Sequence, residues 1–371
     1  MGVLSFGDLT DIRDVRIKSS LTWCESFLEN RSARKLYMTA LLEAQRVTKV
    51  FGGGLFDRTR TVALDNFSMA IGGDTPTITA VVGESGSGKT TLARLLLGVT
   101  SPTSGGVLYK GKDLRKLSKD ESRGFLNDVQ VIFQDPFEVY NPFYHIDHVL
   151  TTPIDYMHLA TSRLEKWRLI ERALETVGLR PEETLGRYPH QLSGGQRQRV
   201  MVARALILKP RIILADEPVS MIDASLRATV LGSLQRIKEE FGISIVYITH
   251  DLTTAYQISD NIVVLYRGAV AEAGRIEQVV RNPSHPYTRL LVSSIPVANP
   301  DHQWSSEAQA AFPEARISQT TCKFANRCPV AMDKCMQKVP PLYQTEPQRA
   351  AACFLYEQSP ALSNDQMDRV F

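Results

Sequence analysis

Short apolar runs of strand length alternate with helical patterns through the middle of this 371-residue chain. A short apolar run indicates a buried strand, whereas apolar positions three or four residues apart indicate a helix face. On this basis we predict strands at residues 78–82, 129–133, 212–215, 243–248 and 262–266, and helices at residues 89–97, 162–177 and 193–208. Because such alternation is typical of βαβ units, it predicts an α/β domain with a mainly parallel core sheet. We expect the last two helices to form a separate helical subdomain.

The pattern divides the chain into three regions. Residues 1–43 are mixed polar and charged, and we predict an N-terminal extension of unknown role, with Met38 as a second candidate start. Residues 44–282 carry the α/β pattern, and about residues 135–205 form its helical subdomain. Residues 283–371 are rich in proline and cysteine with little periodicity, which predicts a small irregular appendage held by something other than a large core.

Composition excludes several classes of protein. The chain is 43% hydrophobic and 22% charged, which is ordinary for a globular protein, and its formal net charge of +3 does not suggest binding to nucleic acid. No apolar run approaches the roughly 18 residues of a membrane span, and the N-terminus lacks a secretory apolar stretch. We therefore expect a cytosolic protein whose membrane role, if any, depends on a partner. In that compartment its five cysteines are expected to be thiols or metal ligands.

A glycine-rich loop follows the first predicted strand and precedes a helix. The loop consists of Gly83, Glu84, Ser85, Gly86, Ser87, Gly88, Lys89, Thr90 and Thr91. Its glycines allow backbone N–H groups to wrap phosphates, Lys89 can reach the β- and γ-phosphates, and the Thr90 hydroxyl can ligate Mg²⁺. The loop predicts a site for ATP and Mg²⁺.

Two acids end the predicted strand at residues 212–215. Asp216 is positioned to hold Mg²⁺ through water, and Glu217 is our candidate for the base that activates the attacking water. Two solvated acids at a strand end are the alternative interpretation.

A second glycine motif starts a later predicted helix. It contains Ser193, Gly194, Gly195 and Gln196. Backbone N–H groups and a hydroxyl at a helix start suit a γ-phosphate, and because the chain already has one phosphate loop, this motif is expected to serve the ATP of another subunit. Here the chain resembles the ATP-binding cassette (ABC) ATPases over about residues 44–280.

The resemblance implies a P-loop NTPase fold with an antiparallel β subdomain beside the core sheet. It further implies that Gln134 senses Mg²⁺ and water, that His250 contacts the γ-phosphate, that Phe51 stacks on adenine, and that Asp223 lies in the loop that crosses to the partner subunit. We expect Glu217, His250, Gln134 and Lys89 to be catalytic, and Thr90, Gln134 and Asp216 to hold Mg²⁺. A lone Gln or His is more often structural, and Phe51 as a core side chain is the alternative to stacking.

Residues 285–291, His-Pro-Tyr-Thr-Arg-Leu-Leu, resemble the segment after the ATPase domain in oligopeptide, dipeptide and nickel ABC importers. The resemblance implies an ATPase subunit at the cytoplasmic face of the inner membrane, driving uptake of peptides, or of nickel or an oligosaccharide. Implied partners are a second ABC ATPase (the same or a sister chain), two transmembrane permeases and, indirectly, an extracellular solute-binding protein. A soluble ABC ATPase in DNA repair or translation is the alternative.

Four cysteines gather in the C-terminal region, at Cys322, Cys328, Cys335 and Cys353. Structural zinc usually takes paired cysteines with roughly two to four residues between them, and the gaps here are wider. Wide gaps and the Cys328-Pro329 step favour a [4Fe–4S] cluster, which some members of the resembled importer branch carry in this region. Zinc and free buried cysteines are the alternatives.

Overall fold

A computed structural model describes residues 40–52, 60–134, 140–295, 320–362 and 370. Its core sheet has the strand order β13-β11-β12-β10-β9-β3-β8-β7-β6, of which β9, β3, β8, β7 and β6 are mutually parallel. The bounds are β3 Ile78–Val82, β6 Val129–Ile132, β7 Ile212–Asp216, β8 Ser244–Thr249, β9 Asn261–Tyr266 and β10 Ala269–Arg275. The five predicted strands are confirmed within two residues at each end.

A second, antiparallel sheet has the strand order β2-β1-β4-β5. Its bounds are β1 Leu42–Gly52, β2 Arg60–Ile71, β4 Ser104–Tyr109 and β5 Lys112–Asp113. Strand β1 begins at Leu42, and the domain boundary at residue 44 stays a prediction. The rest of the predicted extension, with Met38, lies outside the described residues.

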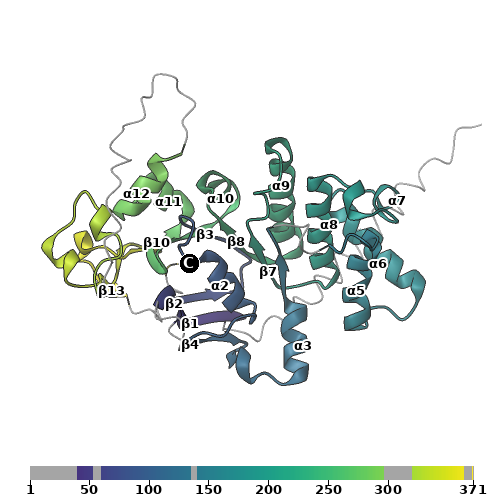
Figure 1. Cartoon of the computed structure of the whole chain (residues 1–371), viewed down its shortest axis with the longest axis horizontal. Coiled ribbons are helices and arrows are strands. Elements are labelled where there is room, and N and C mark those ends of the chain that lie inside the picture. The colour runs from purple at the N-terminus through teal and green to yellow at the C-terminus, as the bar shows by residue number, and fades with distance from the viewer. Residues whose placement is uncertain (1–39, 53–59, 135–139, 296–319, 363–369, 371) are drawn as a thin grey trace, which may run out of the picture.

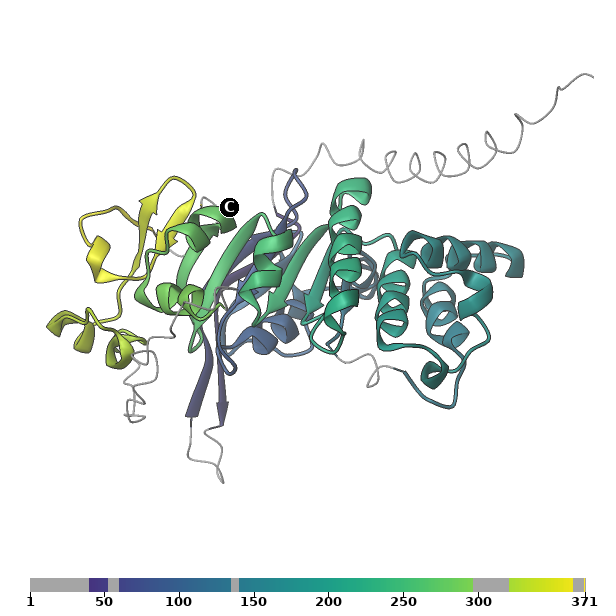
Figure 2. The ribbon, with the colours of Figure 1, turned by 90° about the horizontal axis from the view of Figure 1, so that it is seen from above.

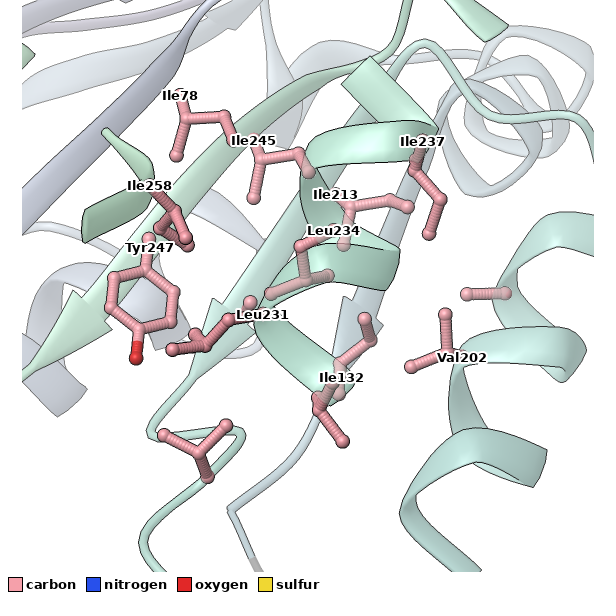
Figure 3. Packing of buried hydrophobic residues seen from close by; sticks show 14 of the residues in the cluster. Ile78, Ile132, Val202, Ile213, Leu231, Leu234, Ile237, Ile245, Tyr247 and Ile258 are labelled. Carbon is pink, nitrogen blue, oxygen red and sulfur yellow. The ribbon is translucent and has the colours of Figure 1, made fainter. Parts of the chain in front are cut away.

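Neighbouring residues of the core strands point to opposite faces of the sheet, as the period of two requires. Ala80 and Val82 face one buried cluster, which Figure 3 shows in part, and Val81 faces the other. In the same way Ile213 joins the first cluster and Leu214 the second. Both faces of the sheet are therefore buried, which explains why its strands are apolar along their whole length.

Helices cover both faces of the core sheet. Helix α2 supplies Leu92, Leu95 and Leu96 to the cluster that also contains residues of β1 and β2, so it lies between the two sheets, whereas α9 and α10 pack on the other face (Figure 1). The bounds are α2 Lys89–Leu96, η2 Leu114–Lys116, α3 Lys119–Asp128, α9 Ala224–Phe241, α10 Leu252–Ile258 and α11 Ile276–Arg281.

The helical subdomain lies at one end of the molecule (Figure 2). Its elements are α5 Ile146–Met157, α6 Arg163–Thr176, α7 Pro181–Thr184, η3 Pro189–Gln191 and α8 Gly194–Ile207. Helices α6 and α8 confirm the two predicted helices, and each begins after a serine whose hydroxyl accepts a backbone N–H of the first turn: Ser162 from Glu165 and Ser193 from Gln196.

The C-terminal extension lies at the opposite end (Figure 2) and continues the core sheet. Strand β12 pairs antiparallel with β10, so that Ala350 lies opposite Ala273. The bounds are α12 Pro286–Ser293, η5 Ala325–Arg327, η6 Asp333–Met336, β11 Leu342–Glu346, β12 Arg349–Ala351, η7 Phe354–Tyr356 and β13 Ala361–Leu362. Its strands and 3₁₀ turns are too short to leave a periodic pattern, which is why the sequence predicted an irregular unit.

Candidate functional site

The glycine-rich loop spans the turn from β3 into α2, and close packing of the backbone requires its glycines. A Cβ on Gly83 would lie 2.2 Å from the carbonyl oxygen of Leu265, and one on Gly88, whose φ is +105°, would lie 2.3 Å from that of Ala63. The hydroxyl of Ser87 is buried with no hydrogen-bond partner among the described residues. This backbone cradle and its spare hydroxyl suit a phosphate group.

Lys89 begins α2 and is buried beneath the loop. Its ammonium donates to the carbonyl oxygens of Gly83 at 2.7 Å and Glu84 at 3.0 Å. Burial lowers the pKa of this ammonium, and the carboxylates of Glu217 and Asp216 oppose the shift. The lysine therefore presents a desolvated cation between the phosphate loop and the two acids.

Three polar side chains from adjacent parallel strands meet at one edge of the sheet. The Glu217 carboxylate accepts a hydrogen bond from Gln134 Nε2 at 3.1 Å and lies 3.0 Å from His250 Nδ1. These residues follow β6, β7 and β8, whose carboxyl ends lie side by side. The structure thus brings together the predicted base Glu217, the predicted sensor Gln134 and His250, the predicted contact to the γ-phosphate.

The backbone of Glu217 fixes the direction of its side chain. Its φ of +46° is rare for a residue other than glycine, and its N–H donates to the carbonyl oxygen of Ile248 at 2.8 Å. This strained conformation turns the carboxylate toward Gln134 and His250, whereas the preceding Asp216 remains in β7.

Asp216 and Thr90 flank the same region. Burial and the neighbouring Glu217 carboxylate raise the pKa of Asp216, while Lys89 and Arg94 oppose that shift. A divalent cation would relieve the repulsion between the two carboxylates, so these residues fit Mg²⁺. Thr90 is exposed in the first turn of α2, where the hydroxyl can serve as a ligand.

The second glycine motif lies at the start of α8 in the helical subdomain, whereas the phosphate loop leads into α2, between the two sheets (Figure 1). Ser193 and Gln196 form a capping box at the start of α8, in which the hydroxyl accepts the Gln196 N–H and the Ser193 N–H donates to Gln196 Oε1. A Cβ on Gly195 would lie 2.8 Å from Leu226 Cδ1, so a larger residue here would have to displace that leucine side chain of α9.

Two further predicted residues are exposed. The Phe51 side chain is 45% exposed at the end of β1, with Lys49 Nζ 5.0 Å from its ring centroid. This exposure contradicts the alternative of a core side chain and leaves the ring free to stack on a base. Asp223 precedes α9 and is also exposed, and its contact with a second subunit stays a prediction.

The four C-terminal cysteines line one small cavity. Most of its remaining lining is apolar, including Phe324, Ala325, Val330, Met332 and Phe354. Burial raises the pKa of the Cys322 and Cys328 thiols, and raises that of Cys353 to about 11. Among the described residues, no three His, Cys, Asp or Glu side chains are grouped closely enough to hold a metal ion. The cluster and the zinc site both stay predictions.

Two residues outside the predicted set contact the phosphate loop. Arg327 forms an ion pair with the Glu84 carboxylate, and the Tyr287 hydroxyl accepts the Glu84 N–H. Tyr287 falls in a segment that we singled out only by resemblance, and Arg327 only adjoins Cys328. Sequence spacing carries no sign that either residue reaches the nucleotide site.

Together, the phosphate loop, the acids at a strand end and the signature motif in a helical subdomain define an ATP-binding cassette ATPase. The family model described as "ABC transporter" matches residues 64–220, and the "Oligopeptide/dipeptide transporter, C-terminal region" matches residues 271–335. This chain belongs to the ABC transporter ATP-binding proteins, in the oligopeptide and dipeptide branch.

Curated relatives support that assignment along most of the chain. The putative oligopeptide transport ATP-binding protein YkfD of Bacillus subtilis is 39% identical over 85% of this chain and 95% of its own length. OppF, an oligopeptide transport ATP-binding protein of Salmonella typhimurium, is 41% identical over 71% of this chain and 79% of its own length. The di/tripeptide transport ATP-binding protein DppF of Pseudomonas aeruginosa is 40% identical, over 75% of this chain and 86% of its own length.

Solved structures agree on the fold. The ATP-binding cassette MJ0796, a dimer bound to ADP and Pi, is 28% identical with a TM-score of 0.56, over 63% of this chain and 98% of its own. The structure of cbiO1 from Clostridium perfringens is 25% identical with a TM-score of 0.57, over 66% and 92% of the two chains. Within the described ranges, no helix is both long and apolar enough to cross a bilayer.

Proposed function

We propose that this chain is the ATP-hydrolysing subunit of a peptide importer. The carrying observation is the contact of Glu217 with both Gln134 and His250 beside the phosphate loop. The chain thus carries all three polar residues that the mechanism below requires. Its relatives are peptide transport ATP-binding proteins. Because the chain belongs to a family of ATPases, its activity is established by that membership, and we propose here the roles of individual residues and the transported solute.

In this proposal the phosphate loop and Lys89 bind the β- and γ-phosphates of ATP. Glu217 accepts the proton of a water that attacks the γ-phosphorus, and the bond to the leaving ADP oxygen breaks. Gln134 and His250 hold the carboxylate and orient the water. Mg²⁺ held through Thr90, Asp216 and Gln134 would neutralise charge on the phosphates.

The site is complete only with a second ATPase subunit, either another copy or a sister chain. Ser193 and the backbone around Gly195 would contact the γ-phosphate held by the partner's phosphate loop, and Asp223 would lie at the junction. The dimeric MJ0796 cassette supports this arrangement. ATP binding then closes the dimer and hydrolysis opens it.

Membrane permeases would be the partners through which this cycle moves peptide, so the chain would act at the cytoplasmic face of the membrane. The segment before α5 exposes two aromatic side chains, Phe143 at 85% and Tyr144 at 51% exposure. Exposed aromatic residues of this kind are enriched at protein interfaces. An extracellular solute-binding protein would deliver the peptide to those permeases.

The cysteine-lined cavity is proposed to hold a [4Fe–4S] cluster through Cys322, Cys328, Cys335 and Cys353, with zinc as the alternative. The support for this proposal is that the four cysteine side chains line one cavity, and cysteine is the usual ligand of such clusters. A bound cluster would cross-link a unit whose own core is small. Iron analysis and a visible spectrum of anaerobically purified protein test this, and a colourless sample containing zinc but no iron contradicts the cluster.

The function is tested with Glu217→Gln in the full importer. We expect the ATP hydrolysis rate to fall about 100-fold or more, because the water loses its base, while ATP binding persists. The matched control is Glu240→Gln on the exposed face of α9, whose loss of one ion pair with Arg236 should not change the rate. Uptake of a labelled oligopeptide into proteoliposomes should stop with Glu217→Gln. Hydrolysis at the unaltered rate would remove Glu217 from the mechanism.

A further inference from the structure

Glu84, the second residue of the phosphate loop, has every polar group engaged. Its carbonyl oxygen accepts from Lys89 Nζ at 3.0 Å and from the Ser87 N–H at 3.1 Å. Its N–H donates to the Tyr287 hydroxyl at 2.9 Å, and its carboxylate binds Arg327. The first two contacts lie within the nucleotide site, whereas the last two come from the region after the ATPase domain.

Arg327 binds Glu84 with two parallel hydrogen bonds. Nη1 donates to Oε2 at 2.9 Å and Nη2 to Oε1 at 3.1 Å, which is the bidentate geometry that favours arginine over lysine. Nη1 also lies 3.3 Å from the Tyr266 hydroxyl. Because 243 residues separate Glu84 from Arg327 in the sequence, only the fold creates this pair.

A buried aromatic group holds both contacts in place. Tyr266, Tyr287 and Phe324 pack with ring centroids 4.4 to 5.6 Å apart, and the Arg327 guanidinium carbon lies 5.8 and 5.7 Å from the Tyr266 and Phe324 ring centroids. Each ring is at most 3% exposed. The guanidinium thus approaches Glu84 from a rigid platform, which limits the entropy lost on forming the ion pair.

The platform adjoins the cysteine-lined cavity. Phe324 lines that cavity, Arg327 directly precedes Cys328, and Tyr287 follows His285 and Pro286, which also line it. Packing around the four cysteines is therefore continuous with the residues that hold Glu84.

We propose that Arg327 and Tyr287 are positioning residues for the phosphate loop, so that the cysteine-rich C-terminal unit sets the ATP affinity of the nucleotide site. They act through Glu84, whose carbonyl oxygen holds Lys89. With Arg327 in place the loop keeps a single arrangement, and ATP binds without having to order it.

A purely structural role for this pair predicts a different result. The C-terminal unit is already attached through the buried ion pair between Arg349 and Glu272, through the β12–β10 pairing, and through an ion pair between Lys323 and Asp65 at 3.0 Å. None of these three attachments involves a residue of the phosphate loop, whereas Arg327 and Tyr287 both contact Glu84. Lys323→Ala is therefore a matched control that removes an ion pair of the same unit elsewhere.

The experiment titrates the full-length chain with a fluorescent ATP analogue and Mg²⁺, and measures melting temperature and ATPase kinetics on the same samples. For Arg327→Ala and Glu84→Gln we expect about three- to fivefold weaker binding, with KM for ATP raised in proportion and kcat retained. Because both substitutions break the same ion pair, the double variant should bind the ATP analogue no more weakly than either single variant. Arg327→Lys should restore part of the affinity, and Lys323→Ala should bind as the unaltered chain.

The proposal is overturned if Arg327→Ala lowers the melting temperature but leaves ATP affinity unchanged, because the pair would then only attach the C-terminal unit. Additive effects of Arg327→Ala and Glu84→Gln would also overturn it. The inference rests on the nucleotide site proposed above, and the experiment distinguishes a failure of the proposed function from a failure of the inference. A chain that binds no ATP refutes the function and with it the inference, whereas normal ATP binding by Arg327→Ala refutes the inference alone.

Discussion

Removing Arg349 should loosen the C-terminal unit from the ATPase domain. Arg349 and Glu272 are 1% and 0% exposed, and the guanidinium donates to Glu272 Oε1 through Nε at 3.0 Å and Nη2 at 2.8 Å. The same carboxylate accepts the N–H groups of Ser284 and His285 at the start of α12. The substitution Arg349→Met keeps most of the side-chain volume but leaves a buried carboxylate without its cation.

The cost follows from the geometry. Removing one partner of a buried ion pair destabilises a protein by about 3–5 kcal/mol, because the remaining charge is uncompensated. Here the two backbone N–H groups still solvate the Glu272 carboxylate, so we expect the lower end, about 3 kcal/mol. Combining Arg349→Met with Glu272→Gln should be milder than Arg349→Met alone, since no buried charge remains and the amide oxygen can still accept the Ser284 and His285 N–H groups.

The assay is chemical denaturation of the full chain, followed by limited proteolysis to locate the first region that opens. Arg349→Met should lower the unfolding midpoint and expose cleavage sites near β11 and β12. The control is Arg281→Met, which removes an exposed ion pair with Glu277 and should change nothing measurable. An unchanged midpoint for Arg349→Met would refute the argument, because a buried Glu272 cannot lose its cation at no cost.

Two other outcomes are expected. Burial lowers the pKa of His285 to about 4, so below pH about 6.5 the unfolded chain takes up a proton that the folded chain does not. The folded state therefore loses up to about 3 kcal/mol of stability as the pH falls from about 6.5 to 4. The difference between the denaturation midpoints at pH 7 and pH 5 should be smaller in His285→Asn than in the unaltered chain. In the Glu217→Gln background, Ser193→Ala should abolish the ATP-dependent dimer seen by size-exclusion chromatography. Ser162→Ala, which removes an equivalent helix cap from α6, should leave that dimer intact. A dimer that persists in both variants would contradict a contact between Ser193 and the γ-phosphate.

The strands of the core sheet could be predicted because both faces of the sheet are buried. Residues such as Ile213 and Leu214 must then both be apolar, and the run stands out from the polar turns beside it. The gathering of Gln134, Glu217 and His250 was also predictable, since each follows a parallel strand and such strands end at one edge. The positive φ of Glu217 was not, because no local residue pattern requires it.

The C-terminal unit was much less predictable. Strand β12 has three residues and owes its place to the pairing with β10, which lies far away in the sequence. A charged residue is rarely buried unless it is paired, and the partner of Arg349 cannot be read from a single sequence. The same holds for Arg327, whose partner Glu84 lies 243 residues away in the sequence.

Two separate sets of residues lie at the ATP site, and the topology brings them there from different parts of the fold. From one side, the ends of β6, β7 and β8 supply Gln134, Glu217 and His250, which would act on the attacking water. From the other side, the C-terminal unit supplies Arg327 and Tyr287, which hold the phosphate loop through Glu84. Substitutions on the first side should therefore lower kcat, and those on the second should raise KM, because the first set acts on bond breaking and the second on the binding of ATP.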